Sequence, residues 1–157
     1  MKKKNRVYLA GPFFSKEQIS RLDEIQKLLA ANPTIGDIFR PGDDEYTATE
    51  FGSFEWQTAV YKHDINNINM SDVVVAMLDY KIEENEMEPD SGTIWECGYA
   101  AANNVPVIGV RNVKDEPLNL MLAGSLTAFF NGPDSIKEIK DYDFNSLMTR
   151  YENVKVL

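Results

Sequence analysis

The chain has 157 residues, a size that suits one domain with its own hydrophobic core. Its 25 acidic and 16 basic residues give a net charge of −9, which disfavours binding to nucleic acid or to an anionic membrane. The single cysteine, Cys97, has no partner for an internal disulfide, and with the single histidine, His63, it makes no zinc-binding cluster. We therefore expect a cytoplasmic protein with one domain over residues 1–157, no metal and no membrane span.

Strand and helix patterns alternate through most of the sequence. Short apolar runs, the strongest of them Asp72–Leu78, predict strands, and apolar residues at helical spacing predict helices between them. A capping box, Ser15-x-x-Gln18, marks the start of the first helix. In chain order we predict a strand at 6–10, a helix from 15 to the Asn32-Pro33 pair, a weak strand around 38–39, a helix at 56–67, a strand at 72–78, a helix at 92–104, a strand at 105–110 and a strand at 125–130.

This order predicts an α/β fold in which crossover helices connect parallel strands. The expected architecture is a single-domain, doubly wound, mainly parallel five-stranded sheet with helices on both faces, of Rossmann or flavodoxin-like type. In the helix at 56–67, Tyr61 is expected to face the core and Asp64 to border it. The remaining stretches are predicted as a loop over the sheet edge at 41–54, a Glu-rich solvated loop at 79–89, a loop ending in 117–121, and a mixture of helix and turns over 134–157.

Several common kinds of site have no support in the sequence. Gly11-Pro12-Phe13 matches neither a dinucleotide-binding nor a triphosphate-binding loop, so no cofactor is expected. His63 lies on a predicted helix far from any serine elbow, which favours a satisfied surface histidine over a member of a catalytic triad. Cys97 is interpreted as a packing residue.

Glu96 is the candidate nucleophile. It lies near the start of the helix that follows the strongest strand, and such helices direct free N–H groups at the crevice where α/β proteins bind ligands. The partial positive charge of these groups favours an ionised acid, which can act as a covalent nucleophile. The same residues also fit a capping box, Thr93-x-x-Glu96, in which the glutamate only binds a backbone N–H. The spacing alone leaves both interpretations open.

Two further acids, Asp64 and Asp90, are expected in the same crevice as Glu96. Paired carboxylates suggest glycosyl transfer, because one acid can attack or stabilise an anomeric carbon while another handles the proton of the leaving group. Taken singly, Asp90 also fits a helix cap and Asp64 an exposed helix residue. Aromatic side chains that could stack on a planar leaving group are expected nearby: Tyr8, Phe13, Phe14 and Trp56.

The sequence resembles the nucleoside 2-deoxyribosyltransferase family. The resemblance covers nearly the whole chain, in ordered motifs at residues 7–14, 50–56, 64–68, 72, 90–100 and 119–121. It implies transfer of a 2-deoxyribosyl group between nucleobases by a retaining double displacement through a covalent deoxyribosyl-glutamate intermediate. The Tyr-Leu-Ala-Gly-Pro start is shared with nucleoside and nucleotide N-hydrolases.

The resemblance also implies roles for individual residues. Glu96 takes the position of the nucleophile, Tyr8 holds its carboxylate by a hydrogen bond, Asp64 transfers a proton at the base, and Asp90 binds sugar hydroxyls. The chain ends in Leu157 where an aromatic residue is expected, so the terminus is left out of the predicted site. The substrate-binding residues it implies are Phe13, Phe14, Glu45 (where family members can carry Gln), Trp56, Gly92, Asn119 and Met121.

The implied ligands are 2′-deoxynucleosides and free purine or pyrimidine bases. Asn119 and Met121 match a segment that an adjoining subunit supplies, which implies a homo-oligomer, a hexamer or a tetramer. Two other functions stay open. One is an N-glycoside hydrolase acting on deoxynucleosides or their monophosphates, although Asp90 and Asn119 make a poor seat for a phosphate dianion. The other is a non-catalytic α/β binding module.

Overall fold

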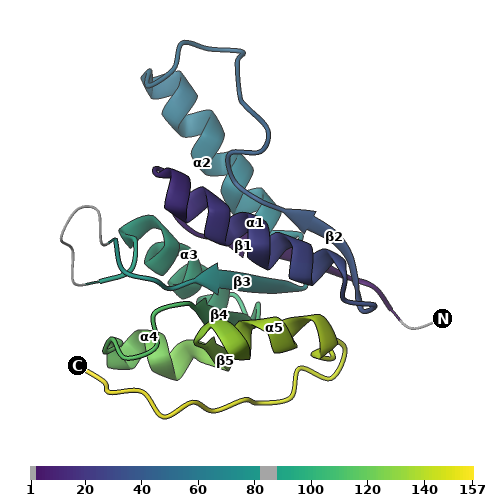
Figure 1. The fold of residues 1–157 in the computed structure, drawn as a ribbon. Coiled ribbons are helices and arrows are strands. Elements are labelled where there is room, and N and C mark those ends of the chain that lie inside the picture. The colour runs from purple at the N-terminus through teal and green to yellow at the C-terminus, as the bar shows by residue number, and fades with distance from the viewer. Residues whose placement is uncertain (1–2, 82–87) are drawn as a thin grey trace.

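The computed structural model describes residues 3–81 and 88–157. Its centre is a parallel sheet of five strands in the order β2-β1-β3-β4-β5 (Figure 1). In this described part no helix combines the length and the hydropathy of a membrane span. The elements are β1 (Asn5–Ala10), α1 (Lys16–Ala30), β2 (Ile35–Phe39), α2 (Phe54–Asn69), β3 (Val73–Met77), α3 (Ser91–Ala102), β4 (Val107–Arg111), α4 (Leu120–Ser125), β5 (Leu126–Asn131), α5 (Pro133–Lys137) and the 3₁₀ helix η2 (Glu138–Asp141).

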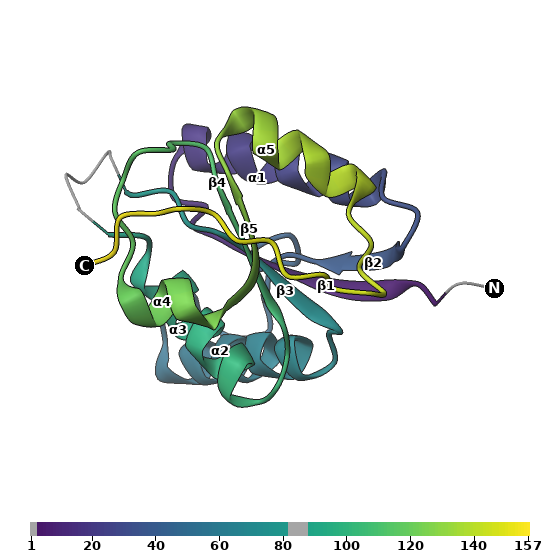
Figure 2. The same ribbon diagram turned by 90° about the horizontal axis from the view of Figure 1, so that it is seen from below.

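Helices cover both faces of the sheet, as predicted. Figure 2 shows α1 and α5 on one face and α2, α3 and α4 on the other. Because successive strand residues point to opposite faces, β3 divides its apolar side chains between two cores. Val75 and Met77 pack with residues of α1 and α5, whereas Val74 and Ala76 pack with residues of α2 and α3. The predicted doubly wound architecture is therefore confirmed.

The start of α1 was predicted correctly from its capping residues. Ser15 Oγ accepts a hydrogen bond from the backbone N–H of Gln18, and Gln18 Oε1 accepts one from the backbone N–H of Ser15, 3.0 Å away. The predicted capping box is therefore formed. The helix buries Leu22, Ile25 and Leu29 at helical spacing against the sheet.

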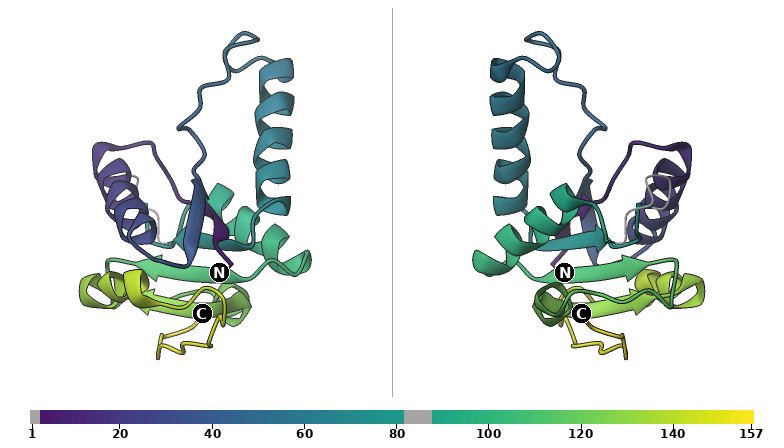
Figure 3. Two further views of the ribbon diagram at one scale, coloured as in Figure 1. Left: turned by 90° about the vertical axis from the view of Figure 1, so that its right-hand side faces the viewer. Right: turned by 90° about the vertical axis from the view of Figure 1, so that its left-hand side faces the viewer.

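The core-facing prediction for Tyr61 is wrong. Its side chain is 56% exposed, while the buried residues of α2, Asn67 and Ile68, lie in its last turns. Figure 3 shows why, because the first turns of α2 stand clear of the sheet and have no strand beneath them. The helical periodicity was read correctly, but a periodic pattern does not reveal how far the neighbouring sheet extends.

The C-terminal third departs furthest from the predicted elements. Residues 117–121 were expected to be loop, yet the last two of them open the short helix α4, and β5 begins at Leu126, one residue later than predicted. After η2 the chain returns in extended form beside β5, where the N–H of Phe129 donates to the carbonyl of Arg150. The final residue then pairs with Leu118 through a 3.1 Å hydrogen bond. Residues 82–87 of the predicted Glu-rich loop lie outside the described residues.

Candidate active site

Tyr8 and Glu96 form the central contact of the site. Tyr8 lies in β1 on the face that packs against α2 and α3, and its side chain is fully buried. Its phenolic Oη donates a hydrogen bond of 2.5 Å to Glu96 Oε1 in the second turn of α3. A bond this short to a carboxylate is charge-assisted and fixes the orientation of the acid. The structure therefore brings together the two residues that the resemblance pairs.

Burial opposes the ionised form of Glu96, which the helix N-terminus was predicted to favour. Burial raises the pKa of Glu96 to about 7, and the negative charges of Asp64 and Asp90 act in the same direction, while the Tyr8 hydrogen bond opposes them. The influence of a helix dipole fades within one turn, and Glu96 lies beyond the first turn of α3. Burial and the charge of Glu96 also raise the pKa of Tyr8, so its phenol stays a donor.

The capping-box alternative for Glu96 is also wrong. The N-cap of α3 is Asp90, whose Oδ2 accepts hydrogen bonds from the backbone N–H and the Oγ1 of Thr93 at 2.9 and 3.2 Å. The cap interpretation of Asp90 thus holds for one of its oxygens. The other, Oδ1, lies 3.7 Å from the ammonium of Lys81, and both side chains are only 12% exposed.

Glu96 opens onto a small cavity of about 320 Å³ that also contains Asp64 and Gly92. Its outer wall is aromatic, formed by Tyr61 and Trp95, whose rings meet edge to face at 5.7 Å. Burial raises the pKa of Asp64, and the nearby His63 lowers it by a smaller amount. Two acids with raised pKa values facing one cavity are an arrangement suited to acid–base and nucleophilic chemistry.

Asp64 also borders a second, larger cavity of about 540 Å³. Gly42 adopts a φ of +87° there, a conformation that other residues rarely adopt, and a Cβ at this position would lie only 3.2 Å from the ring of Phe13, so glycine suits this turn. The loop that Gly42 begins forms one wall of the cavity. Four of the predicted substrate-binding residues line this cavity: Phe13, Phe14, Glu45 and Trp56.

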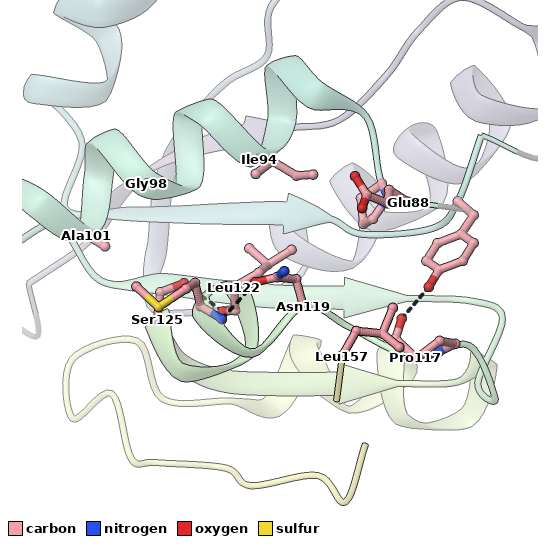
Figure 4. A pocket seen from close by; sticks show the side chains of 12 residues that line it. Glu88, Ile94, Gly98, Ala101, Pro117, Asn119, Leu122, Ser125 and Leu157 are labelled. Carbon is pink, nitrogen blue, oxygen red and sulfur yellow. Dashed lines mark hydrogen bonds between the residues drawn. The ribbon is translucent and has the colours of Figure 1, made fainter. Parts of the chain in front are cut away.

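Asn119 and Met121 do not join the other predicted site residues. They line a third cavity of about 450 Å³ on the opposite side of α3, next to Leu122 and the final residue, Leu157 (Figure 4). Asn119 caps α4 by accepting from the N–H of Met121 at 2.9 Å, and Met121 is 80% exposed. Leu157, left out of the predicted site, therefore lies beside two residues that were included in it.

Several residues of these cavities were not predicted from the sequence. Trp95, next to the nucleophile candidate, and Phe39, at the carboxyl end of β2, could have been found from the rule that ligands bind beyond strand ends. His63 is exposed and hydrogen-bonded to Asn67, as expected for a satisfied surface histidine. It also lines the larger cavity. Cys97 is buried and burial raises its pKa to about 12, which confirms it as a packing residue.

A deep acid hydrogen-bonded to tyrosine, a second acid and an aromatic cavity together suit chemistry at a glycosidic carbon. The family model described as nucleoside 2-deoxyribosyltransferase matches residues 7–135. The chain is 34% identical to a nucleoside deoxyribosyltransferase from Limosilactobacillus fermentum, with 92% of this chain and 89% of that protein covered. The structure of a 2-deoxyribosyltransferase from Bacillus psychrosaccharolyticus matches with a TM-score of 0.80 and 30% identity, over 94% of this chain and 99% of that one.

The chain therefore belongs to the nucleoside 2-deoxyribosyltransferase family, as its motifs predicted. This membership makes it an enzyme and removes the non-catalytic binding module as an alternative. The chain is also 25% identical, over 85% of its length and 88% of that protein, to a relative from Syntrophotalea carbinolica whose name proposes a 2′-deoxynucleoside 5′-phosphate N-hydrolase.

The raised pKa of Glu96 predicts that this residue destabilises the fold at high pH. Its carboxyl titrates near 4.5 ordinarily and near 7 in the folded protein, so the native state loses stability as pH rises between these values. Relative to wild type, Glu96→Gln should gain about 3 kcal/mol of unfolding free energy between about pH 4 and about pH 8. Urea unfolding at both pH values measures this, and a difference that does not change with pH would show that Glu96 titrates like an exposed acid.

Proposed function

We propose that this enzyme transfers 2-deoxyribosyl groups between nucleobases by a double displacement at Glu96. The proposal rests on the hydrogen bond that Tyr8 donates to Glu96, because Glu96 lines a cavity together with Asp64. Because Asp64 borders both cavities, a sugar beside Glu96 and a base among Phe13, Phe14 and Trp56 would meet at Asp64. This placement supports Asp64 as the group that exchanges a proton with the base.

In the first step ionised Glu96 attacks C1′ on the face opposite the base. The C1′–N bond breaks, its electron pair goes to the base nitrogen, and the proton of Asp64 moves to the base. The raised pKa of Asp64 suits this role because it keeps the acid protonated to a higher pH. The product is an ester between Glu96 and the 2-deoxyribosyl group.

In the second step another base attacks C1′ of the ester and Glu96 departs as a carboxylate. The Tyr8 phenol stabilises that carboxylate, so the same hydrogen bond assists both the attack and the departure. Two inversions give overall retention of configuration. The aromatic wall of the larger cavity favours stacking of a base over entry of water, which favours transfer over hydrolysis.

The site of one protomer is proposed to be completed by another, in a hexamer or a tetramer. Asn119 and Met121 lie across α3 from Glu96, so they cannot reach the nucleophile of their own chain without passing the helix. The same surface exposes Leu120, Met121 and Leu157, which are 60%, 80% and 66% exposed. Exposed apolar residues around a largely apolar cavity support a contact with a second copy.

The proposed reaction predicts base exchange. Incubation of the protein with a 2′-deoxynucleoside and a second free base should yield the second deoxynucleoside, measured by chromatography. Glu96→Gln keeps the shape of the side chain but cannot form the ester, so exchange should fall by at least about a thousandfold. Glu24→Gln, on the exposed surface of α1, is the matched control and should exchange normally. Free deoxyribose without any exchanged nucleoside would favour the N-hydrolase instead.

The role of Tyr8 predicts a shift in the pH dependence of exchange. Only ionised Glu96 attacks and only protonated Asp64 supplies a proton, so kcat/KM should pass through a maximum in pH, and one limb should have its midpoint at about pH 7, the pKa of Glu96 in wild type. Tyr8→Phe removes the hydrogen bond that lowers the pKa of Glu96, so the midpoint should move up by roughly one pH unit. Tyr142→Phe, which removes a phenol on the other face of the sheet, should leave it in place. An unshifted midpoint in Tyr8→Phe would contradict the role given to Tyr8.

A further inference from the structure

His63 is held in one tautomer by contacts that begin at Arg6. The guanidinium of Arg6 can only donate, so the Asn67 atom 2.7 Å from its Nη2 must be the amide oxygen. Arg6 itself is fixed by a 2.7 Å ion pair with Asp37. The amide nitrogen of Asn67 therefore points the other way, toward His63, where it donates to the backbone carbonyl of His63 at 2.9 Å.

The same amide nitrogen lies 3.2 Å from Nε2 of the His63 ring. Because the Asn67 nitrogen is a donor, Nε2 must accept, and a neutral imidazole that accepts at Nε2 carries its hydrogen on Nδ1. The ring is also placed by Phe39, which it meets edge to face at 5.4 Å. Phe39 and Asn67 thus fix the position of the ring, and Arg6, through Asn67, fixes which ring nitrogen carries the proton.

The Nδ1–H group is available to a ligand in the larger cavity. His63 lines that cavity together with Phe14 and Trp56, and its side chain is exposed. Within residues 3–81 and 88–157, the Nδ1–H group donates no hydrogen bond. Asp64, the next residue of α2, lines the same cavity. The cavity therefore presents an N–H donor beside the acid that we assign to proton exchange with the base.

We propose that His63 is a base-binding residue that makes the enzyme prefer 6-oxopurines to 6-aminopurines as acceptors. This inference rests on the proposed function. The edge of a 6-oxopurine carries two neighbouring acceptors, N7 and O6, whereas adenine carries the acceptor N7 beside the donor N6–H₂. With Asp64 addressing N7, His63 Nδ1–H donates to O6 of a 6-oxopurine. The same group opposes the amino group of adenine, leaving two donors face to face.

A competition between two acceptors tests the proposal. The protein is incubated with one pyrimidine deoxynucleoside as donor and with equal amounts of hypoxanthine and adenine as acceptors. The two purine deoxynucleosides formed are then measured together. Both products arise from the same ester, so enzyme amount and the first step cancel in their ratio. Wild type should favour the hypoxanthine product about tenfold, as expected for one net hydrogen bond.

His63→Phe keeps a flat ring but has no donor, and it should bring the ratio close to one. Lys62→Gln, an exposed neighbour on α2, is the matched control and should keep the wild-type ratio. A variant that only disturbs folding would lower both products equally. The proposal is overturned if wild type favours adenine or neither base, if His63→Phe keeps the ratio, or if pyrimidine bases exchange and purines do not. Absence of exchange with every base would instead contradict the proposed function.

Discussion

The hydrogen bond from Tyr8 to Glu96 joins two elements that are 88 residues apart in the sequence. It depends on the order of the sheet, because β1 pairs directly with β3 and α3 follows β3 across the same face. Tyr8 pairs with Val74 in that register and points to the α3 face. A slip of one residue would turn Tyr8 to the opposite face. The contact between Tyr8 and Glu96 is therefore a consequence of strand register.

The site combines groups that the fold does not need. Burial opposes the charged forms of both Asp64 and Glu96, and Tyr8 only partly compensates for Glu96. Such a cluster lowers stability at the pH where it is active, a trade commonly found at functional sites. The aromatic cavity beside it can hold a planar base, and the Arg6–Asn67–His63 contacts give that cavity a polar group of defined direction.

Local patterns were sufficient for much of the fold. The apolar run of β3 and the capping box of α1 are encoded by neighbouring residues, and both were predicted correctly. Tyr61 and α4 were not, because their environments depend on where the sheet ends and on how the C-terminal residues return beside β5. In the candidate site, sequence motifs predicted the hydrogen bond between Tyr8 and Glu96, which is formed. The pKa of Glu96 and the tautomer of His63 depend on long-range contacts that no local pattern contains.

The proposed bond between Glu96 and an anomeric carbon can be detected by peptide mass spectrometry. The enzyme is mixed with a 2′-deoxynucleoside without any acceptor base, quenched in acid within the first turnover and digested. We expect the peptide containing Glu96 to carry the added mass of one deoxyribosyl group, bound at that residue. An enzyme that exchanges bases while this peptide stays unmodified, or that carries the sugar on Asp64 or Asp90, would contradict it.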